Sequence, residues 1–274
     1  MSTRSADGTG QTSSGDVAWA RGKPARAANR VILGGVLRPL VAFYGHPQTA
    51  GVENLEGLEP PFILCANHSS HMDTPLVLLA LPKRLRRRTL VAAAADYFFS
   101  NRLKGGLTAL AVGAVPIERR RPTRETMERV RRLLGEGWAL LVYPEGTRTP
   151  DGRLYRGKTG VARIALEGGF PVVPVGVKGT FEAFPADRRM PRRAEVEVRF
   201  GKPIRFERYR DRPMDQFVLR SVTDEIMYEI MLLTGQEYVD EYSRRERPAL
   251  EPNQIAAPEG PPIEAKREIQ ASSS

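Results

Sequence analysis

Short apolar runs alternate with segments of helical periodicity between about residues 28 and 243. The runs that we interpret as strands are FILCA (62–66), TLVAAAA (89–95), WALLVYP (138–144), PVVPVGV (171–177) and AEVEVRF (194–200). The first four are apolar almost throughout, as strands covered on both faces of a sheet should be. In AEVEVRF, apolar residues alternate with charged ones, which predicts an edge or half-exposed strand. The pattern therefore predicts an α/β fold, a mixed β-sheet covered by helices.

Helical patterns lie between the predicted strands. Thr74 and Pro75 are suited to the N-cap and first position of a helix over PLVLLAL. A second helix is expected over TRETMERVRRLL (123–134), and a third over residues 159–167, where Gly168 and Gly169 stop it. The last helical segment is QFVLRSVTDEIMYEIMLLTG, with Phe217, Val222, Ile226 and Ile230 near helical spacing. These helices would cover the apolar sheet.

The two ends of the chain differ from this body in composition. Residues 1–27 are rich in Ser, Gly, Thr and Arg, and residues 244–274 are rich in Pro, Glu and Ser. Both segments have little apolar periodicity, so we predict that they are disordered. Residues 28–243 are expected to form a single domain.

The start of the predicted domain carries the apolar segment 31–44. It is broken by Arg38 and Pro39, and it is shorter than the ~20 residues that a membrane-spanning helix needs. Residues 28–45 could form an interfacial helix, with basic residues at the lipid headgroups. They could equally form a first helix that packs on the core. The sequence leaves both alternatives open.

The net charge of +10 favours acidic partners: nucleic acid, anionic lipid or a phosphorylated substrate. The basic run KRLRRR (83–88) has no interleaved aromatic residues and no nucleic-acid-binding signature, so we expect no nucleic-acid partner. An anionic membrane surface suits the same charges, at ~1 kcal/mol per basic residue. The single cysteine, Cys65, excludes an intramolecular disulfide and suits a reducing compartment.

The stretch NHSSHMD (67–73) places two of the three histidines of the chain next to an acid. His68 and Asp73 are five residues apart, about 500° of rotation on a helix, so they can meet only if the chain turns between them. A histidine beside a carboxylate has a fixed tautomer, and its Nε2 is free to act as a general base. The stretch should therefore be a loop between a strand end and a helix, where sites in α/β sheets collect.

Other chemistries use the same residue types. A serine hydrolase would need a G-x-S-x-G turn, which Ser69 and Ser70 lack. His68, His71 and Asp73 could supply three metal ligands, but the rest of the body adds only scattered carboxylates and His46, so no metal is expected. We interpret His71 as a structural or pocket-lining residue and Cys65 as an inert strand residue.

A second polar stretch, PEGTR (144–148), joins a strand end to a turn. The backbone N–H groups of such a turn, together with Arg148, can hold an anion. Glu145 can accept hydrogen bonds from a polyol or pair with an arginine. Lys158 stands at the start of a predicted helix, where its charge and the helix dipole both favour phosphate. Pro174 interrupts an apolar strand, as if to border a pocket.

These motifs, in this order, resemble those of the glycerolipid acyltransferases, the lysophosphatidic acid acyltransferase group. The four blocks of that family are NHxSxxD, matched by Asn67, His68, Ser70 and Asp73; a glycine block, matched by Gly113, Ile117, Glu118 and Arg119; [F/Y]PEGTR[S/T], matched by residues 143–149; and VPV, matched by residues 173–175. The resemblance covers about residues 50–205. Pro116 and Glu118 depart from the commoner residues of the second block, and the long apolar N-terminal anchor is reduced to residues 31–44.

The resemblance implies a glycerol-3-phosphate acyltransferase-like domain in which His68, oriented by Asp73, is the catalytic base. The substrate-binding residues that it implies are Arg119, Glu145, Gly146, Thr147, Arg148 and Lys158, with Pro174 in the acyl pocket. It implies no cofactor and no metal, with acyl-CoA or acyl carrier protein as co-substrate. The implied location is the cytoplasmic face of a membrane, peripheral or monotopic. Two alternatives remain: a thioester or lipid hydrolase that uses the same His–Asp pair, and a non-catalytic lipid-binding protein.

Overall fold

A computed structural model of the chain describes residues 22–94, 112–117, 124–185, 188 and 190–243. All of these residues belong to one compact unit, which ends at Ser243. The predictions for Arg119 and for the tail 244–274 lie outside the described residues.

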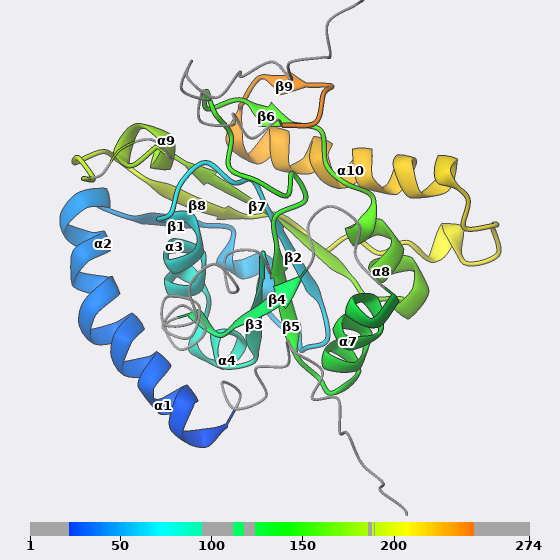
Figure 1. The fold of residues 1–274 in the computed structure, drawn as a ribbon, viewed down its shortest axis with the longest axis horizontal. Coiled ribbons are helices and arrows are strands. Elements are labelled where there is room, and N and C mark those ends of the chain that lie inside the picture. Colours follow the sequence, from blue (N-terminus) through cyan, green and yellow to red (C-terminus); the bar gives the residue numbers. More distant parts are fainter. Residues whose placement is uncertain (1–21, 95–111, 118–123, 186–187, 189, 244–274) are drawn as a thin grey trace, which may run out of the picture. The chain divides into compact units, whose positions relative to one another are not determined.

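The main sheet within this described part has seven strands in the order β1-β8-β7-β2-β5-β3-β4 (Figure 1). The strands are β1 (Gln48–Ala50), β2 (Ile63–Ala66), β3 (Thr89–Ala94), β4 (Ala114–Ile117), β5 (Ala139–Val142), β7 (Val172–Lys178) and β8 (Glu197–Phe200). Only β7 and β8 pair antiparallel among these strands, and the other neighbours are parallel. A second, two-stranded parallel sheet joins β6 (Leu154–Tyr155) to β9 (Tyr238–Val239). The predicted α/β fold with a mixed sheet is confirmed.

Helices lie on both faces of the main sheet (Figure 1). The helices on the first face are α1 (Lys23–Val31), a π-helix η2 (Ile32–Leu37), α2 (Arg38–Gly45), α3 (Asp73–Ala80) and α4 (Lys83–Arg86), with α9 (Thr180–Ala183) beside them. The second face carries α7 (Arg124–Gly135), α8 (Gly160–Gly168) and α10 (Gln216–Thr234). Short 3-10 turns, η3 (Val52–Leu55) and η4 (Glu207–Tyr209), occur in the connections.

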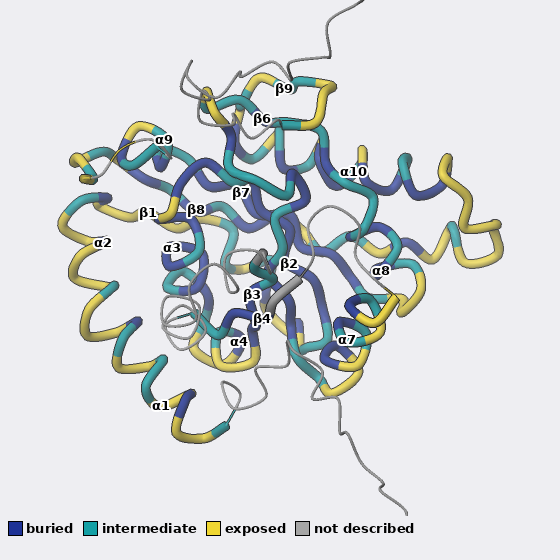
Figure 2. The backbone as a smooth tube through the Cα atoms, in the orientation of Figure 1, coloured by how far each residue is buried: buried dark blue, intermediate teal, exposed yellow. Residues whose placement is uncertain are grey.

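Strand β2 shows why the central strands are apolar throughout. Leu64 and Ala66 pack into the core formed with α3 and α4, whereas Ile63 and Cys65 pack into the core formed with α7, α8 and α10. All four are fully buried, in the dark-blue centre of Figure 2. Burying one such aliphatic side chain contributes roughly 1.5–3 kcal/mol. The prediction that this strand is covered on both faces is confirmed.

Strand β8, predicted to be an edge or half-exposed strand, is half-exposed: its burial alternates along the strand, and it lies between β7 and β1. The edge is instead β1, whose polar and exposed sequence QTA gave no strand signal. In α10, Phe217 is 75% exposed while Val222 is fully buried. The five-residue spacing explains this, because 500° of rotation leaves the two side chains about 140° apart.

The N-terminal helical segment packs on the core, one of the two alternatives left open for residues 28–45, while a place in a membrane interface remains a prediction. Its helix begins at Lys23, so residues 23–27 are helical rather than disordered as predicted. Leu33 and Val41 are buried in the core. The side chains of Val31, Val36, Leu40 and Phe43 are between 48% and 68% exposed. No helix of the described ranges is long and apolar enough to span a bilayer.

Candidate active site

The candidate site lies where β2 and β5 end. These strands are neighbours and run parallel, so the loops that follow them leave the same edge of the sheet. The loop after β2 holds residues 67–72, and the loop after β5 holds residues 143–149. The two loops are bonded directly, since the Thr149 amide donates to the His68 carbonyl at 2.8 Å. The two polar stretches, NHSSHMD (67–73) and PEGTR (144–148), are therefore brought together.

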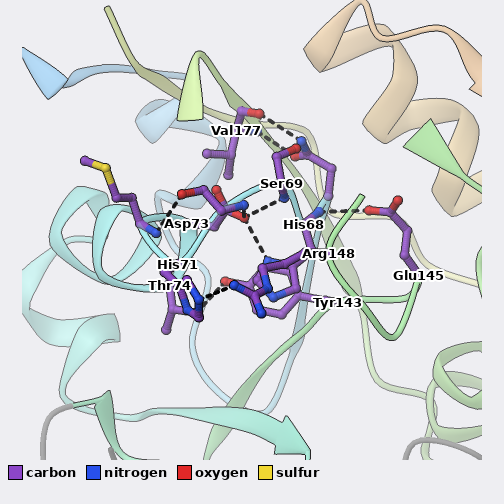
Figure 3. A network of polar contacts seen from close by, with 12 residues as sticks. His68, Ser69, His71, Asp73, Thr74, Tyr143, Glu145, Arg148 and Val177 are labelled. Carbon is purple, nitrogen blue, oxygen red and sulfur yellow. Dashed lines mark hydrogen bonds and ion pairs between the residues drawn. The ribbon is translucent and has the colours of Figure 1, made fainter. Parts of the chain in front are cut away.

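His68 and Asp73 meet as the sequence predicts. The Asp73 Oδ2 atom accepts from His68 Nδ1 at 2.8 Å and from the amides of Ser69 and Ser70 at 2.7 Å each (Figure 3). Asp73 is fully buried, whereas the His68 side chain is 15% exposed. Because Nδ1 faces the carboxylate, the Nε2 atom is left to act as a base.

Asp73 begins α3, so the two residues meet at a helix N-terminus. The N-cap position belongs to Met72, and Thr74 lies inside the helix, contrary to the prediction. Thr74 Oγ1 instead shares a hydrogen bond of 2.8 Å with Tyr143 Oη. The Tyr143 ring stacks on the His68 ring, with 4.0 Å between centroids and 19° between planes. Burial and the Asp73 charge raise the pKa of Tyr143, so its hydroxyl stays protonated.

Glu145 connects the two loops through the main chain. Its side chain is buried, Oε1 accepts from the His68 amide at 2.8 Å, and Oε2 accepts from the Tyr155 amide at 3.0 Å. Burial raises the pKa of Glu145 to about 8; the Asp73 charge adds to this effect, and the two hydrogen bonds oppose it. This geometry positions His68, and the predicted contact between Glu145 and a substrate remains a prediction.

The remaining predicted substrate-binding residues follow β5 or pack against that loop. Gly146 adopts φ +76°, and a Cβ atom there would lie 2.8 Å from Lys158 Nζ, so the lysine side chain covers the glycine. The Lys158 amide donates to the Pro144 carbonyl at 2.8 Å, just before α8 begins. Thr147 and Arg148 are half-buried. Two cationic side chains thus border this turn.

The Arg148 guanidinium also reaches the first loop. Its Nη1 atom contacts Nε2 of His71, as the dashed line in Figure 3 marks. His71 therefore links the two loops at their exposed side, while Glu145 links them in the interior. The described part of the chain holds no group of three or more His, Cys, Asp or Glu side chains that could bind a metal ion.

The chain is similar in sequence and in fold to known acyltransferases. A model of the Acyltransferase family matches residues 47–178. The crystal structure of PlsC, the 1-acyl-sn-glycerophosphate (LPA) acyltransferase of Thermotoga maritima, aligns with a TM-score of 0.55 and 25% identity, over 77% of this chain and 80% of that one. Residues 47–178 of the chain are thus similar to a domain of the Acyltransferase family.

Curated members of the family include two plant 1-acyl-sn-glycerol-3-phosphate acyltransferases. The chloroplastic protein BAT2 of Brassica napus is 30% identical over 56% of this chain and 44% of its own length. The protein of Cocos nucifera is 29% identical over 66% of this chain and 57% of its own. The chain thus spans about half the length of the curated relatives that it matches.

Pro174 lies within β7 of the acyltransferase domain. It is in register with Cys65 of β2, and its carbonyl accepts from the Gly201 amide at 2.8 Å. Pro174 is thus buried in the sheet, and its place in an acyl pocket remains a prediction. Burial raises the pKa of the neighbouring Cys65 thiol, which agrees with an inert strand residue.

Two side-chain amides, to which the sequence analysis gave no role, support the loop after β2. Asn67 bonds to the main chain of Val177 through both its amide atoms, at 2.7 and 2.8 Å. Its Nδ2 atom also donates to Gln236 Oε1 at 3.0 Å, and Gln236 Nε2 donates to the Gly152 carbonyl at 2.6 Å. Asn67 belongs to the first family block, but Gln236 lies outside the matched region. No local pattern marks Gln236, because its partners are distant in sequence.

Ser70 supports the same loop. Its hydroxyl donates to the Phe184 carbonyl at 2.6 Å and accepts from the Met72 amide at 3.1 Å. The serine of the first block is therefore engaged in holding the loop, and its geometry is that of a supporting residue.

Proposed function

We propose that the protein is an O-acyltransferase that moves a fatty acyl group from a thioester to the hydroxyl of a lysophospholipid. The preferred acceptor is 1-acylglycerol 3-phosphate, and the donor is acyl-CoA or acyl carrier protein. The observation that carries this proposal is the His68–Asp73 pair, held at a strand end beside Arg148. The names of the relatives support the choice of acceptor.

The proposed reaction uses His68 Nε2 as the base. It takes the proton from the acceptor hydroxyl as the oxygen attacks the thioester carbonyl. The C–O bond forms, the C–S bond breaks, and the proton passes from His68 to the departing thiolate. Asp73 holds the imidazole in the tautomer with the proton on Nδ1 and stabilises the imidazolium that forms. The thioester is already activated, so bringing the reactants together supplies much of the remaining rate enhancement.

The acceptor phosphate is assigned to Arg148 and Lys158, together with Arg119 outside the described residues. Gly146 and Thr147 are assigned to the glycerol side of the same turn, where the Gly146 amide already donates to the Tyr143 carbonyl. Glu145 contributes through the His68 amide that it holds. Pro174 is assigned to the acyl-chain side.

The proposal includes attachment to the cytoplasmic face of an anionic membrane. The exposed apolar side chains of the N-terminal segment, with Arg26 and Arg30 exposed nearby, have the composition of an interfacial helix. The lysophospholipid acceptor partitions into the membrane, so attachment would bring the site to its acceptor.

The test is transfer from a labelled acyl thioester, with and without 1-acylglycerol 3-phosphate. We expect product only with the acceptor, and a loss of about 10³-fold in His68→Ala, because general base catalysis contributes roughly 10²–10⁴-fold. His46→Asn is a matched control, since His46 is exposed and has φ +36°, which asparagine tolerates. Thioester cleavage at the same rate without acceptor would indicate a hydrolase. Full transfer by His68→Ala would exclude the mechanism.

A further inference from the structure

His71 and Arg148 form a contact that the proposed chemistry does not use. His71 is exposed in the loop after β2, three residues beyond His68, and Arg148 stands in the loop after β5. Arg148 Nη1 lies against His71 Nε2. A guanidinium has only donors, so Nε2 must be the acceptor. The proton of the imidazole is therefore on Nδ1, and the ring is neutral.

The surroundings of His71 keep this ring neutral. Desolvation by neighbouring protein atoms lowers its pKa to about 4, with further contributions from Arg148 and His68 and an opposing one from Asp73. At neutral pH the ring is therefore an acceptor almost all of the time. The ring centroids of Phe184 and His71 are 5.9 Å apart, and the two ring planes are tilted by 44°.

A neutral acceptor has a consequence for Arg148 that a carboxylate would not have. An Asp or Glu at position 71 would orient the guanidinium, but it would also neutralise its charge and compete with an incoming phosphate. A lysine there would repel it. An imidazole fixes the direction of one N–H and places no negative charge beside the guanidinium.

We propose that His71 is a positioning residue that orients Arg148 toward the phosphate of the acceptor and thereby sets the affinity for phosphorylated lysolipids. This inference rests on the proposed function, because it takes Arg148 as a phosphate ligand. His71 does not touch the reacting atoms, so its removal should weaken acceptor binding and leave the chemical step intact.

The experiment compares three variants. His71→Leu removes the acceptor atom, His71→Gln keeps a neutral acceptor, and His71→Glu supplies a charged one. With 1-acylglycerol 3-phosphate, we expect KM to rise about tenfold in His71→Leu while kcat and the donor KM stay within about twofold. His71→Gln should restore most of the affinity. His71→Glu should bind the acceptor as weakly as His71→Leu, because its carboxylate occupies Arg148.

A binding measurement separates this inference from the proposed function. Calorimetric titration of 1-acylglycerol 3-phosphate into His68→Ala and into His68→Ala/His71→Leu needs no turnover. A matching loss of affinity supports the role of His71 even if the wild-type protein transfers no acyl group. Equal affinities, or a His71→Gln variant no better than His71→Leu at equal melting temperature, would overturn it.

Discussion

Two buried carboxylates, one at the start of α3 and one in the loop after β5, hold the same histidine from opposite ends. Asp73 binds the imidazole of His68, and Glu145 binds its main-chain amide. Their exposed fractions are 0% and 1%. Each also accepts from other backbone amides: Asp73 from Ser69 and Ser70, and Glu145 from Tyr155. Burial alone therefore does not distinguish a catalytic carboxylate from a scaffolding one.

The difference lies in what each carboxylate contacts. Asp73 shares a hydrogen bond with a group that changes its charge during the proposed reaction, so it acts on the chemistry directly. Glu145 contacts only main-chain donors among its described hydrogen bonds, so its effect on the chemistry passes through the position of His68. Substitutions should therefore separate the two residues: one mainly changes rate, and the other mainly changes stability.

The largest effect is expected for Asp73→Asn. The amide can offer an N–H to Nδ1 and so stabilise the wrong tautomer, and it cannot stabilise an imidazolium. In a Ser-His-Asp triad the same change lowers kcat by about 10⁴-fold, and we expect a loss of 10³-fold or more here. Steady-state transfer assays at saturating acceptor measure this loss. Asp215→Asn is the control, because Asp215 caps α10 and asparagine caps equally well.

A smaller effect on rate is expected for Glu145→Gln. The amide keeps one acceptor oxygen but turns an N–H₂ group toward a buried main-chain donor, at a cost of about 1–3 kcal/mol. The melting temperature should fall by roughly 2–4 °C per kcal/mol, with about a tenfold loss of kcat. Thermal unfolding monitored by circular dichroism tests this prediction. The exposed Glu182→Gln variant should unfold like the wild-type protein.

The pH dependence of unfolding sharpens the same contrast. The folded pKa of Glu145, about 8, is above the ordinary value of 4.5, so between these values the folded protein keeps a proton that the unfolded chain has released. The free energy of unfolding should therefore fall as pH rises from about 4.5 to about 8, by a few kcal/mol at most. Glu145→Gln should lack this component. If the free energy of unfolding changed with pH in the same way for the wild-type and variant proteins, the raised pKa of Glu145 would be contradicted.

The smallest effect is expected for Gln236→Ala. This change removes the hydrogen bonds to Asn67 and Gly152, but Asn67 keeps both bonds to Val177. The backbone of the His68 loop should stay in place, with about a twofold to fivefold loss of kcat. A loss as large as that of Asp73→Asn would mean that the C-terminal segment contributes directly to catalysis.

The features that could be predicted from the sequence are those that depend on the spacing of residues close together in the chain. The turn between His68 and Asp73 follows from the five-residue separation and from the apolar strand before it. The role of Glu145 could not be predicted, because its partners are main-chain amides that any residue could supply. Gln236 reaches Asn67 across 169 positions. Strand β1 is held by pairing with β8 rather than by apolar side chains of its own.

The family signature stops at Lys178, but the folding unit does not. Helix α10 lies beyond that point, and its side chains Val222, Ile226 and Ile230 are fully buried against the sheet face that α8 also covers. A chimera that exchanged only residues 47–178 would transfer the candidate site without α10 and β9. These two elements pack against the transferred part of the chain. Recombination with a related protein should therefore place its junction after Ser243, where the compact unit ends.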